Sequence, residues 1–164
     1  MKKTYLGGGC FWGMEYYLKE LNGVTETSVG FMGGDDKFTT YDDVKMGTTG
    51  HAEIVEVIYD EAELSFEELM LFFFRLHDPT TENRQHNDIG TQYRSAIFTS
   101  SDEELETAQR VIAKLDEAQV FDSKIVTKVE PMGSYHMASE IHQDYLQKYP
   151  NGYNCHSLRD EFKL

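Results

Sequence analysis

The sequence has few cysteines, few prolines and no long apolar run. Its 164 residues include two cysteines and three prolines. Two cysteines cannot build the disulfide framework that stabilises many small secreted proteins. The longest apolar run, residues 69–74, is far shorter than the roughly 20 residues that a membrane-spanning helix requires. We therefore expect a protein that neither spans a membrane nor depends on structural disulfides.

Positive charge is also scarce. Fifteen lysines and arginines stand against 29 acidic residues, which gives a formal net charge of −14. No cluster of basic residues is present that would neutralise several phosphates, and phosphate contacts supply most of the affinity for nucleic acids. The composition therefore argues against nucleic acids and acidic membrane surfaces as partners.

The N-terminal residues show no apolar segment like that of a signal peptide, so we expect a cytoplasmic protein. We also expect a monomer. The length is that of one domain, residues 1–164, with a C-terminal tail from about residue 149 to 164. In a reducing compartment Cys10 and Cys155 are not expected to form a permanent disulfide. Each is therefore either a small buried apolar residue or a reactive thiol.

Apolar spacing and turn residues predict alternating strands and helices. Ser65 and Glu68 form a capping box, and Ser101 begins a second capped helix. The pattern favours an α+β fold, a two-layer α/β sandwich with a ferredoxin-like core and a mixed sheet. The predicted strands are residues 3–9, 24–31, 51–59, 93–99 and 124–130, and the predicted helices are residues 11–21, 66–77, 102–117 and 137–148.

Two polar segments interrupt this alternation. One follows Asp36 and carries Tyr41, and the other runs from Asp78 to Gln92. A stretch of that length is more than a compact domain usually spends on a plain connection. We expect the second segment to be functional.

Cys10 follows three glycines, at the point where a predicted strand turns into a predicted helix. The positive end of a helix stabilises a thiolate and lowers the pKa of a cysteine placed there. Gly7, Gly8 and Gly9 would allow a sharp turn and expose backbone amides to an anion. The alternative is that the glycines only let the strand and helix pack closely.

Phe11 and Trp12, directly after Cys10, would form the wall of an apolar pocket beside the thiol. Such a wall suits a methyl group. The alternative places the only tryptophan of the chain in the core, where large aromatic side chains usually lie.

Three long motifs then occur in order. Residues 9–15 read Gly-Cys-Phe-Trp-Gly-Met-Glu, residues 41–53 run from Tyr41 to a Gly-His-Ala-Glu ending, and residues 77–95 begin His-Asp-Pro-Thr-Thr. Together they closely resemble the signature of the methionine sulfoxide reductase A family, and the resemblance covers nearly the whole chain. His86 departs from the family's more usual glycine, and residues 138–139 and 141–143 also differ. These departures are expected to lie outside the chemical centre.

The resemblance implies a thiol-dependent oxidoreductase that repairs oxidised proteins. Its substrate would be the S epimer of methionine sulfoxide, free or in proteins and peptides. No prosthetic group is implied, and the reducing equivalents would come from thioredoxin or from a small thiol such as dithiothreitol.

The resemblance also assigns roles to residues. Cys10 would be the nucleophile, and Glu53 the acid that protonates the sulfoxide oxygen, with a pKa raised by burial next to a strand. Tyr41 and Tyr93 would donate hydrogen bonds to that oxygen. Phe11, Trp12, Tyr41, Glu53 and Tyr93 would bind the substrate.

Attack on the sulfoxide would leave Cys10 as a sulfenic acid, which condenses with a second thiol. Cys155, in the C-terminal tail, is the only other cysteine and would resolve it as a Cys10–Cys155 disulfide. Asp88 resembles a further active-site carboxylate of the family, and its task stays open.

Two other readings fit the residues alone. Cys10, His51 and Glu53 have the chemical types of a cysteine hydrolase triad. The second alternative is a metal-binding module formed by potential ligands near the C-terminus, although the spacing of these residues is poor for a metal site. These ligands are His136, Glu140, His142, Cys155 and His156.

Overall fold

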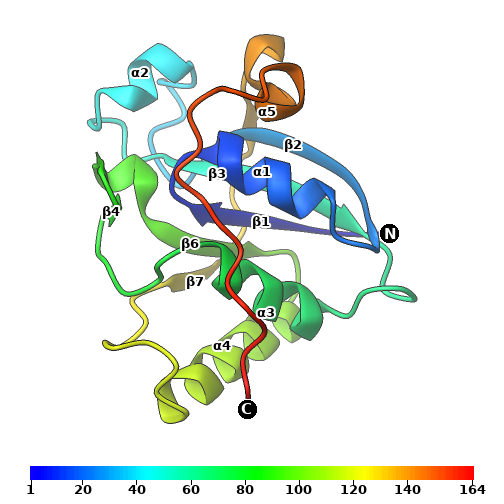
Figure 1. Ribbon diagram of the computed structural model, residues 1–164. Coiled ribbons are helices and arrows are strands. Elements are labelled where there is room, and N and C mark those ends of the chain that lie inside the picture. Colours follow the sequence, from blue (N-terminus) through cyan, green and yellow to red (C-terminus); the bar gives the residue numbers. More distant parts are fainter.

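The computed structural model describes all 164 residues, and its core follows the order strand, helix, strand, strand, helix, strand (Figure 1). The strands are β1 (Lys2–Gly8), β2 (Val24–Met32), β3 (Ala52–Tyr59), β4 (Arg84–Gln85), β5 (Asp88–Ile89), β6 (Ser95–Thr99), β7 (Lys128–Pro131) and β8 (His136–Met137). The helices are α1 (Phe11–Lys19), α2 (Tyr41–Lys45), α3 (Phe66–Leu76), α4 (Asp102–Glu117) and α5 (Tyr145–Lys148). Two short 3₁₀ helices are η1 (Thr91–Tyr93) and η2 (Glu140–His142).

The main sheet has six strands in the order β7-β6-β1-β3-β2-β8. Its four central strands are antiparallel and, numbered by their place in the core, have the ferredoxin-like order 4-1-3-2. At the edges, β7 pairs parallel to β6 and β8 pairs antiparallel to β2, so the sheet is mixed. The predicted α+β sandwich with a ferredoxin-like core is therefore confirmed.

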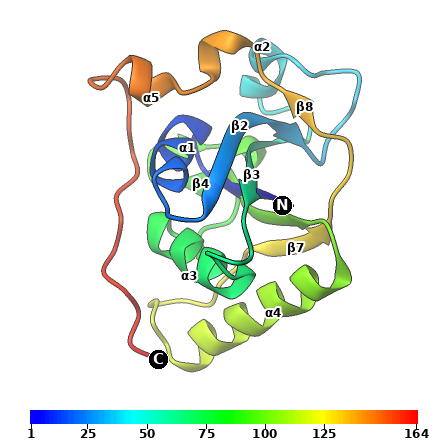
Figure 2. The ribbon, with the colours of Figure 1, turned by 90° about the vertical axis from the view of Figure 1, so that its right-hand side faces the viewer.

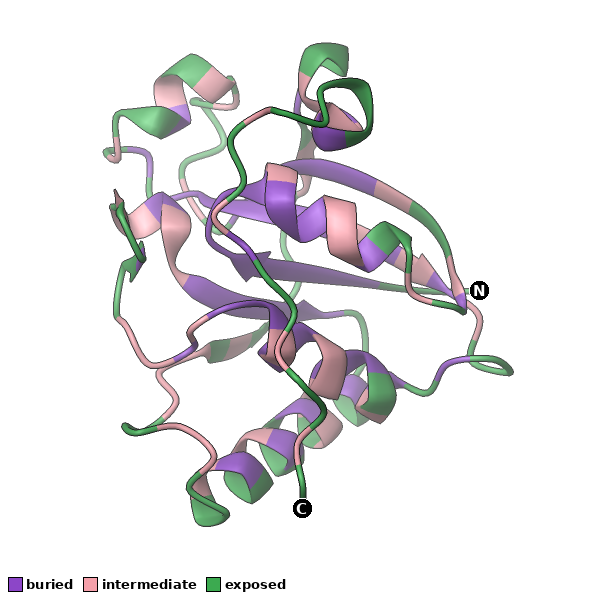
Figure 3. Cartoon of the chain, in the orientation of Figure 1, coloured by how far each residue is buried: buried purple, intermediate pink, exposed green.

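Helices α1, α3 and α4 cover one face of the sheet (Figure 2). Because side chains alternate along a strand, one set of strand residues joins the large core beneath these helices, for example Leu6, Val55 and Val57. The other set, including Tyr5 and Ile54, forms a smaller cluster on the opposite face. Strands β1, β3 and β6 are buried along most of their length (Figure 3).

Two helix starts agree with the sequence prediction. The Ser65 hydroxyl accepts from the Glu68 amide, and the Glu68 carboxylate accepts from the Ser65 amide, which completes the capping box of α3. Ser101 caps α4 by accepting from the Glu104 amide. No helix of the structure is long and apolar enough to cross a membrane.

The predicted helix at residues 137–148 is wrong. The segment forms β8, the 3₁₀ helix η2 and the short helix α5. Its backbone and side chains bind the edge of β2: the Ala138 amide donates to the Val29 carbonyl, and the Gln143 amide side chain bonds both the amide and the carbonyl of Val29. A left-handed residue, Asp144 (φ 53°), separates η2 from α5.

Three further boundaries differ from the prediction. Tyr41, expected in a loop, begins the short helix α2, which Thr40 caps through the Asp43 amide. Tyr93 belongs to η1 rather than to the following strand. The strand predicted from residue 124 starts only at Lys128, because the Val126 amide donates to the Pro79 carbonyl instead of a neighbouring strand.

The C-terminal segment, residues 149–164, has no regular secondary structure and runs past α1 and then along α3 (Figures 1 and 2). Arg159 and Arg75 are joined by two hydrogen bonds, from the Arg159 amide to the Arg75 carbonyl and from the Arg75 side chain to the Arg159 carbonyl. Phe162 packs edge-on against Phe121. The end of the segment is thus fastened to α3 and to the residues that follow α4.

Candidate active site

Cys10 stands between β1 and α1 as the residue that precedes the helix, and its side chain is buried. Gly9 makes the turn with φ +97°, where a Cβ would lie 2.6 Å from the Gln85 Cγ atom. Gly7 and Gly8 belong to β1 and pair with β6. The expectation that all three glycines expose their amides to an anion is therefore wrong for Gly7 and Gly8, which allow close packing. Only Gly9 has a backbone conformation that requires glycine.

The thiol of Cys10 is not a resting thiolate. Burial raises the pKa of Cys10 well above its ordinary value, and the nearby Glu53, Cys155 and Asp88 raise it further. A backbone hydrogen bond from Trp12 acts in the opposite direction but is the weaker influence. The expectation that the helix start lowers this pKa is wrong, because desolvation of the anion exceeds the effect of the amide.

Glu53 lies beneath the start of α1. Glu53, Val55 and Val57 are alternate residues of β3, so their side chains lie on the same face of the sheet, the face that the helices cover. The Phe11 amide donates to Glu53 Oε1 at 3.1 Å, whereas the buried Oε2 has no partner. Burial raises the pKa of Glu53 to about 8, with a further contribution from Asp88, so the carboxyl group is protonated at neutral pH.

Tyr41 and Tyr93 face the same group of side chains. Burial, together with the nearby Glu53, Cys10 and Asp88, raises the pKa of Tyr41 to about 12. The pKa of Tyr93 is raised by burial and then by Glu53, Tyr41, Asp88 and Cys10. The structure therefore brings together four of the predicted site residues around Cys10, and both phenols keep their protons.

An aromatic wall stands beside this group. Trp12 stacks on Tyr145 with 3.9 Å between ring centroids, and its indole nitrogen donates to His142 Nδ1 at 3.2 Å. The His142 ring lies 4.2 Å from Tyr41 and 5.8 Å from Phe11, centroid to centroid. Phe11 itself is almost fully buried, so of the two predicted wall residues only Trp12 is partly exposed.

The sequence prediction missed His142 and Tyr145 as parts of this wall. Residues 141–143 were expected to lie outside the chemical centre, and the contact of His142 with Trp12 and Tyr41 shows that this is wrong. The sequence departs from the family pattern only next to this residue, at Ile141, whereas His142 itself is the residue usual in the family. The place of His142 in the wall depends on η2 folding back over α1, which no local pattern predicts.

Asp88 and Cys155 meet on the other side of Cys10. Asp88 Oδ2 accepts from the Tyr153 hydroxyl at 3.1 Å and from the Cys155 thiol at 3.5 Å. Burial and Asp88 raise the pKa of Cys155 to about 11. Both cysteines are free thiols, and their charges influence each other.

Asp88 follows a two-residue turn that joins β4 to β5, and the first turn residue, His86, has φ +52°. A positive φ at this position favours glycine. We expect His86→Gly to raise the free energy of unfolding by up to about 1 kcal/mol, because the left-handed strain exceeds the entropy that glycine adds to the unfolded chain.

Thermal melting measures this effect, and Asn87→Gly is the matched control. Asn87 is the second turn residue and has no positive φ. We expect His86→Gly to melt higher than the parent protein and Asn87→Gly to melt lower. A lower melting temperature for His86→Gly contradicts this expectation.

The hydrolase reading meets an obstacle at His51, and the same obstacle applies to a group of potential metal ligands that the sequence did not predict. The Gly34 amide donates to His51 Nδ1 at 3.0 Å, and Nε2 bonds the Asp35 carbonyl at 2.8 Å. Neither nitrogen is left to receive a proton from Cys10. Potential ligand atoms of Asp36, His51 and His136 lie within 4.8 Å of one another, but His51 has no free lone pair for a cation.

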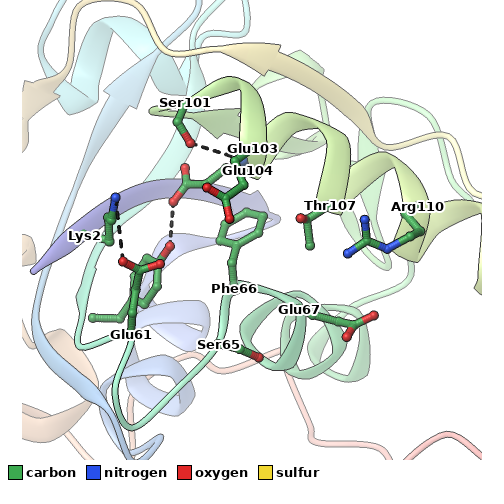
Figure 4. A pocket seen from close by; sticks show the side chains of 11 residues that line it. Lys2, Glu61, Ser65, Phe66, Glu67, Ser101, Glu103, Glu104, Thr107 and Arg110 are labelled. Carbon is green, nitrogen blue, oxygen red and sulfur yellow. Dashed lines mark hydrogen bonds and ion pairs between the residues drawn. The ribbon is translucent and has the colours of Figure 1, made fainter.

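The ligand set expected near the C-terminus is not assembled either. His142 Nδ1 is occupied by Trp12, and His156 Nε2 by the Gly8 carbonyl at 2.7 Å. A separate hollow lies between the start of β1, α3 and α4, and it is lined mainly by polar and charged residues such as Lys2, Glu61 and Glu104 (Figure 4). It contains neither cysteine and is not part of the site around Cys10.

Known proteins share this arrangement over the full chain. Residues 2–163 match the family model described as peptide methionine sulfoxide reductase. The peptide methionine sulfoxide reductase MsrA of Streptomyces avermitilis is 47% identical over 163 residues, which are 99% of this chain and 94% of the relative. This chain belongs to the peptide methionine sulfoxide reductase family.

Solved structures agree with this assignment. Mxr1 from Saccharomyces cerevisiae in its reduced form superposes with a TM-score of 0.92 at 39% identity, covering 97% of this chain and 92% of that chain. Mxr1 in complex with Trx2 superposes with a TM-score of 0.65 at 29% identity, covering 97% and 90%.

Proposed function

We propose that this protein reduces the S epimer of methionine sulfoxide, free or in peptides and proteins, to methionine, with Cys10 as nucleophile and Glu53 as proton donor. One observation carries the proposal: a buried, protonated carboxyl group whose Oε2 has no partner lies next to the cysteine at the start of α1. A sulfoxide oxygen is a hydrogen-bond acceptor that fits such a donor.

In the proposed reaction Cys10 Sγ attacks the sulfoxide sulfur while Glu53 protonates the sulfoxide oxygen. The thiol proton of Cys10 passes to Glu53, and a bond forms between Cys10 Sγ and the substrate sulfur. The protonated oxygen leaves the substrate sulfur as water, and a water molecule then attacks Cys10 Sγ; the bond between the two sulfurs breaks, methionine leaves as the thioether, and Cys10 becomes a sulfenic acid. The balance is one thiol and one sulfoxide giving one sulfenic acid and one thioether. Because Cys10 is protonated at rest, the group that removes its proton and the group that protonates the substrate need to act together.

Tyr41 and Tyr93 support the same step. Their raised pKa values keep both hydroxyl groups protonated, so each is available to donate a hydrogen bond to the sulfoxide oxygen as negative charge develops there. Trp12 and Phe11, with His142 and Tyr145 behind them, form the apolar surface for the methyl group of the substrate. Burial of one methyl group contributes about 1 kcal/mol to binding.

Recycling is proposed to use Cys155. Its thiol attacks the Cys10 sulfur, water leaves, and a Cys10–Cys155 disulfide forms. Asp88 is proposed to orient Cys155 through the 3.5 Å contact. Thioredoxin then reduces the disulfide, a step supported by the solved complex of Mxr1 with Trx2. Thiols supply all the electrons, so the reaction requires no prosthetic group.

Separated sulfoxide epimers of a blocked methionine test the proposal. The protein is incubated with dithiothreitol and each epimer, and thioether formation is followed by chromatography. We expect turnover of the S epimer only. If neither epimer is reduced, the proposed function is wrong, and equal turnover of the R epimer contradicts the stereochemical assignment.

Glu53→Gln is expected to slow the chemical step by about 10²–10⁴-fold, because an amide of the same shape has no acidic proton to donate. Substrate affinity should change little. The parent rate should fall as the pH rises through about 8, where Glu53 loses its proton, and the variant should lack this fall. Single-turnover rates from pH 6 to 9 measure both effects, and a variant as fast as the parent excludes Glu53 from the role.

Thermal stability gives a second readout for the same variant. The folded state holds the Glu53 proton up to about pH 8, whereas the unfolded state releases it near 4.5. The contribution of Glu53 to the free energy of unfolding therefore falls as the pH rises from 4.5 to about 8, by up to about 1.4 kcal/mol per pH unit. Glu53→Gln should melt higher than the parent at pH 8 and show little difference at pH 4.

A further inference from the structure

His156 is a buried histidine that the proposed reduction of the sulfoxide does not use. It follows Cys155 in the tail and lies against the first strand and first helix. Its ring nitrogens have two different partners: Nε2 is 2.7 Å from the Gly8 carbonyl oxygen, and Nδ1 is 3.7 Å from Cys155 Sγ.

These partners fix the tautomer of the ring. A carbonyl oxygen only accepts hydrogen bonds, so Nε2 carries the hydrogen and donates it to Gly8. Nδ1 then keeps its lone pair and can accept the hydrogen of the Cys155 thiol in place of Asp88 Oδ2. Burial lowers the pKa of His156, which keeps the ring neutral at pH 7 and its lone pair available.

The ring is also held in place. A Cβ added at Gly13 on α1 would lie 2.3 Å from His156 Nδ1, so the helix approaches the ring as closely as a glycine allows. The backbone of His156 is fixed on both sides, because its amide donates to Asn154 Oδ1 and its carbonyl accepts from the Tyr17 hydroxyl. The position of Nδ1 is therefore set by the fold and not by a mobile side chain.

We propose that His156 is the general base of the recycling step, taking the proton of Cys155 as its sulfur attacks the sulfenic acid of Cys10. This inference rests on the proposed function. The S–O bond of the sulfenic acid breaks while the S–S bond forms, the proton of Cys155 passes to Nδ1, and the hydroxyl group leaves as water after receiving a proton. Cys155 is oxidised, the sulfenic sulfur is reduced, and the imidazole is regenerated when it gives up the proton.

A base is needed because the Cys155 thiol does not ionise readily. Burial raises its pKa to about 11, so only about one molecule in 10⁴ carries the thiolate at pH 7. Without a base the step would depend on that small fraction. A neutral imidazole beside the thiol removes the proton during the attack, as in other cysteine and histidine pairs.

Asp88 is the other acceptor close to Cys155: its Oδ2 lies 3.5 Å from Sγ and His156 Nδ1 lies 3.7 Å from it, so the two differ in their other partners rather than in distance. Asp88 Oδ2 already accepts the Tyr153 hydroxyl at 3.1 Å, whereas Nδ1 of His156 has no hydrogen-bond partner besides the thiol. Besides Asp88, the titratable group that influences His156 is His86, and its charge opposes protonation of the ring. Asp88 favours the protonated ring once it forms.

His156→Gln tests the proposal in a single turnover without external reductant. Methionine formed is measured by chromatography, and the loss of the two thiols by a thiol reagent after acid quenching. The Cys10 thiol is lost as methionine forms, so the loss of the second thiol, that of Cys155, reports the recycling step. We expect the rate of this second loss to fall at least about tenfold at pH 7, far more than the rate of methionine formation. The thiol-loss rate of the variant should rise about tenfold per pH unit toward that of the parent, as Cys155 ionises without help.

Two controls separate the role of the ring from a structural effect. Tyr17→Phe removes the bond to the His156 carbonyl but leaves the ring in place, and it should lose thiols as fast as the parent. If His156→Gln does not fold, His156→Ala with added imidazole replaces it, and imidazole should restore thiol loss. Methionine formation by the parent tests the proposed function separately. A variant that loses thiols at the parent rate, or an Asp88→Asn variant that alone shows the slow, pH-dependent loss, overturns the assignment to His156.

Discussion

Cys10→Ser is expected to abolish sulfoxide reduction with every reductant. A serine hydroxyl at this position would still meet Glu53 and the aromatic wall, but it does not form the sulfenic acid that the proposed reaction requires. The measurement is methionine formed per enzyme with dithiothreitol and with thioredoxin. We expect no product above the uncatalysed background in either case.

The fold should survive this change. The Cys10 side chain forms no capping hydrogen bond to α1, and serine is nearly the same size. Circular dichroism and thermal melting check that the variant is folded, and binding of the sulfoxide checks that the pocket is intact. A folded variant that still reduces the substrate would remove Cys10 as the nucleophile, and with it the proposed mechanism.

Cys155→Ser is expected to divide the cycle into its two halves. The variant should produce about one methionine per enzyme and then stop when thioredoxin is the only reductant, because no disulfide forms for thioredoxin to attack. Dithiothreitol is small enough to reach the sulfenic acid of Cys10 directly and should restore part of the turnover. Product per enzyme is measured under each reductant.

The matched control is a serine at a neighbouring tail position that does not touch the cysteines, and Leu158→Ser provides it, since Leu158 is exposed. That control should turn over with both reductants like the parent. If Cys155→Ser also turns over with thioredoxin at the parent rate, Cys155 is not the resolving residue, and the contact between Cys155 and Asp88 has another purpose.

Several features of the fold were predictable because they depend on neighbours in the chain. The run of β-branched residues in β3 predicted a buried strand, and the structure places Val55 and Val57 on one side of the sheet and Ile54 on the other. Ser65 and Ser101 cap helices through residues three positions away. Motif order then assigned the family and placed Cys10, Glu53 and Asp88 in one site.

Other features depend on partners far away in the chain. Residues 137–148 have the apolar spacing of a helix. Gln143, however, bonds both the amide and the carbonyl of Val29 at the edge of β2, which a continuous helix would not do, so the segment forms short elements over α1. The pKa of Cys10 likewise reverses the local expectation. A helix start favours the thiolate, but Glu53 from β3 and the burial imposed by the surrounding side chains outweigh it.

The sequence by itself therefore determined the fold class, the family and the pair of cysteines, since each follows from periodicity, capping or motif order. Only the tertiary structure decided the protonation of the site and the neighbours of each thiol. Burial and long-range hydrogen bonds set those properties, and they bring His142 to Trp12 across 130 positions and His156 to Gly8 across 148. No window of the sequence contains both partners of either contact.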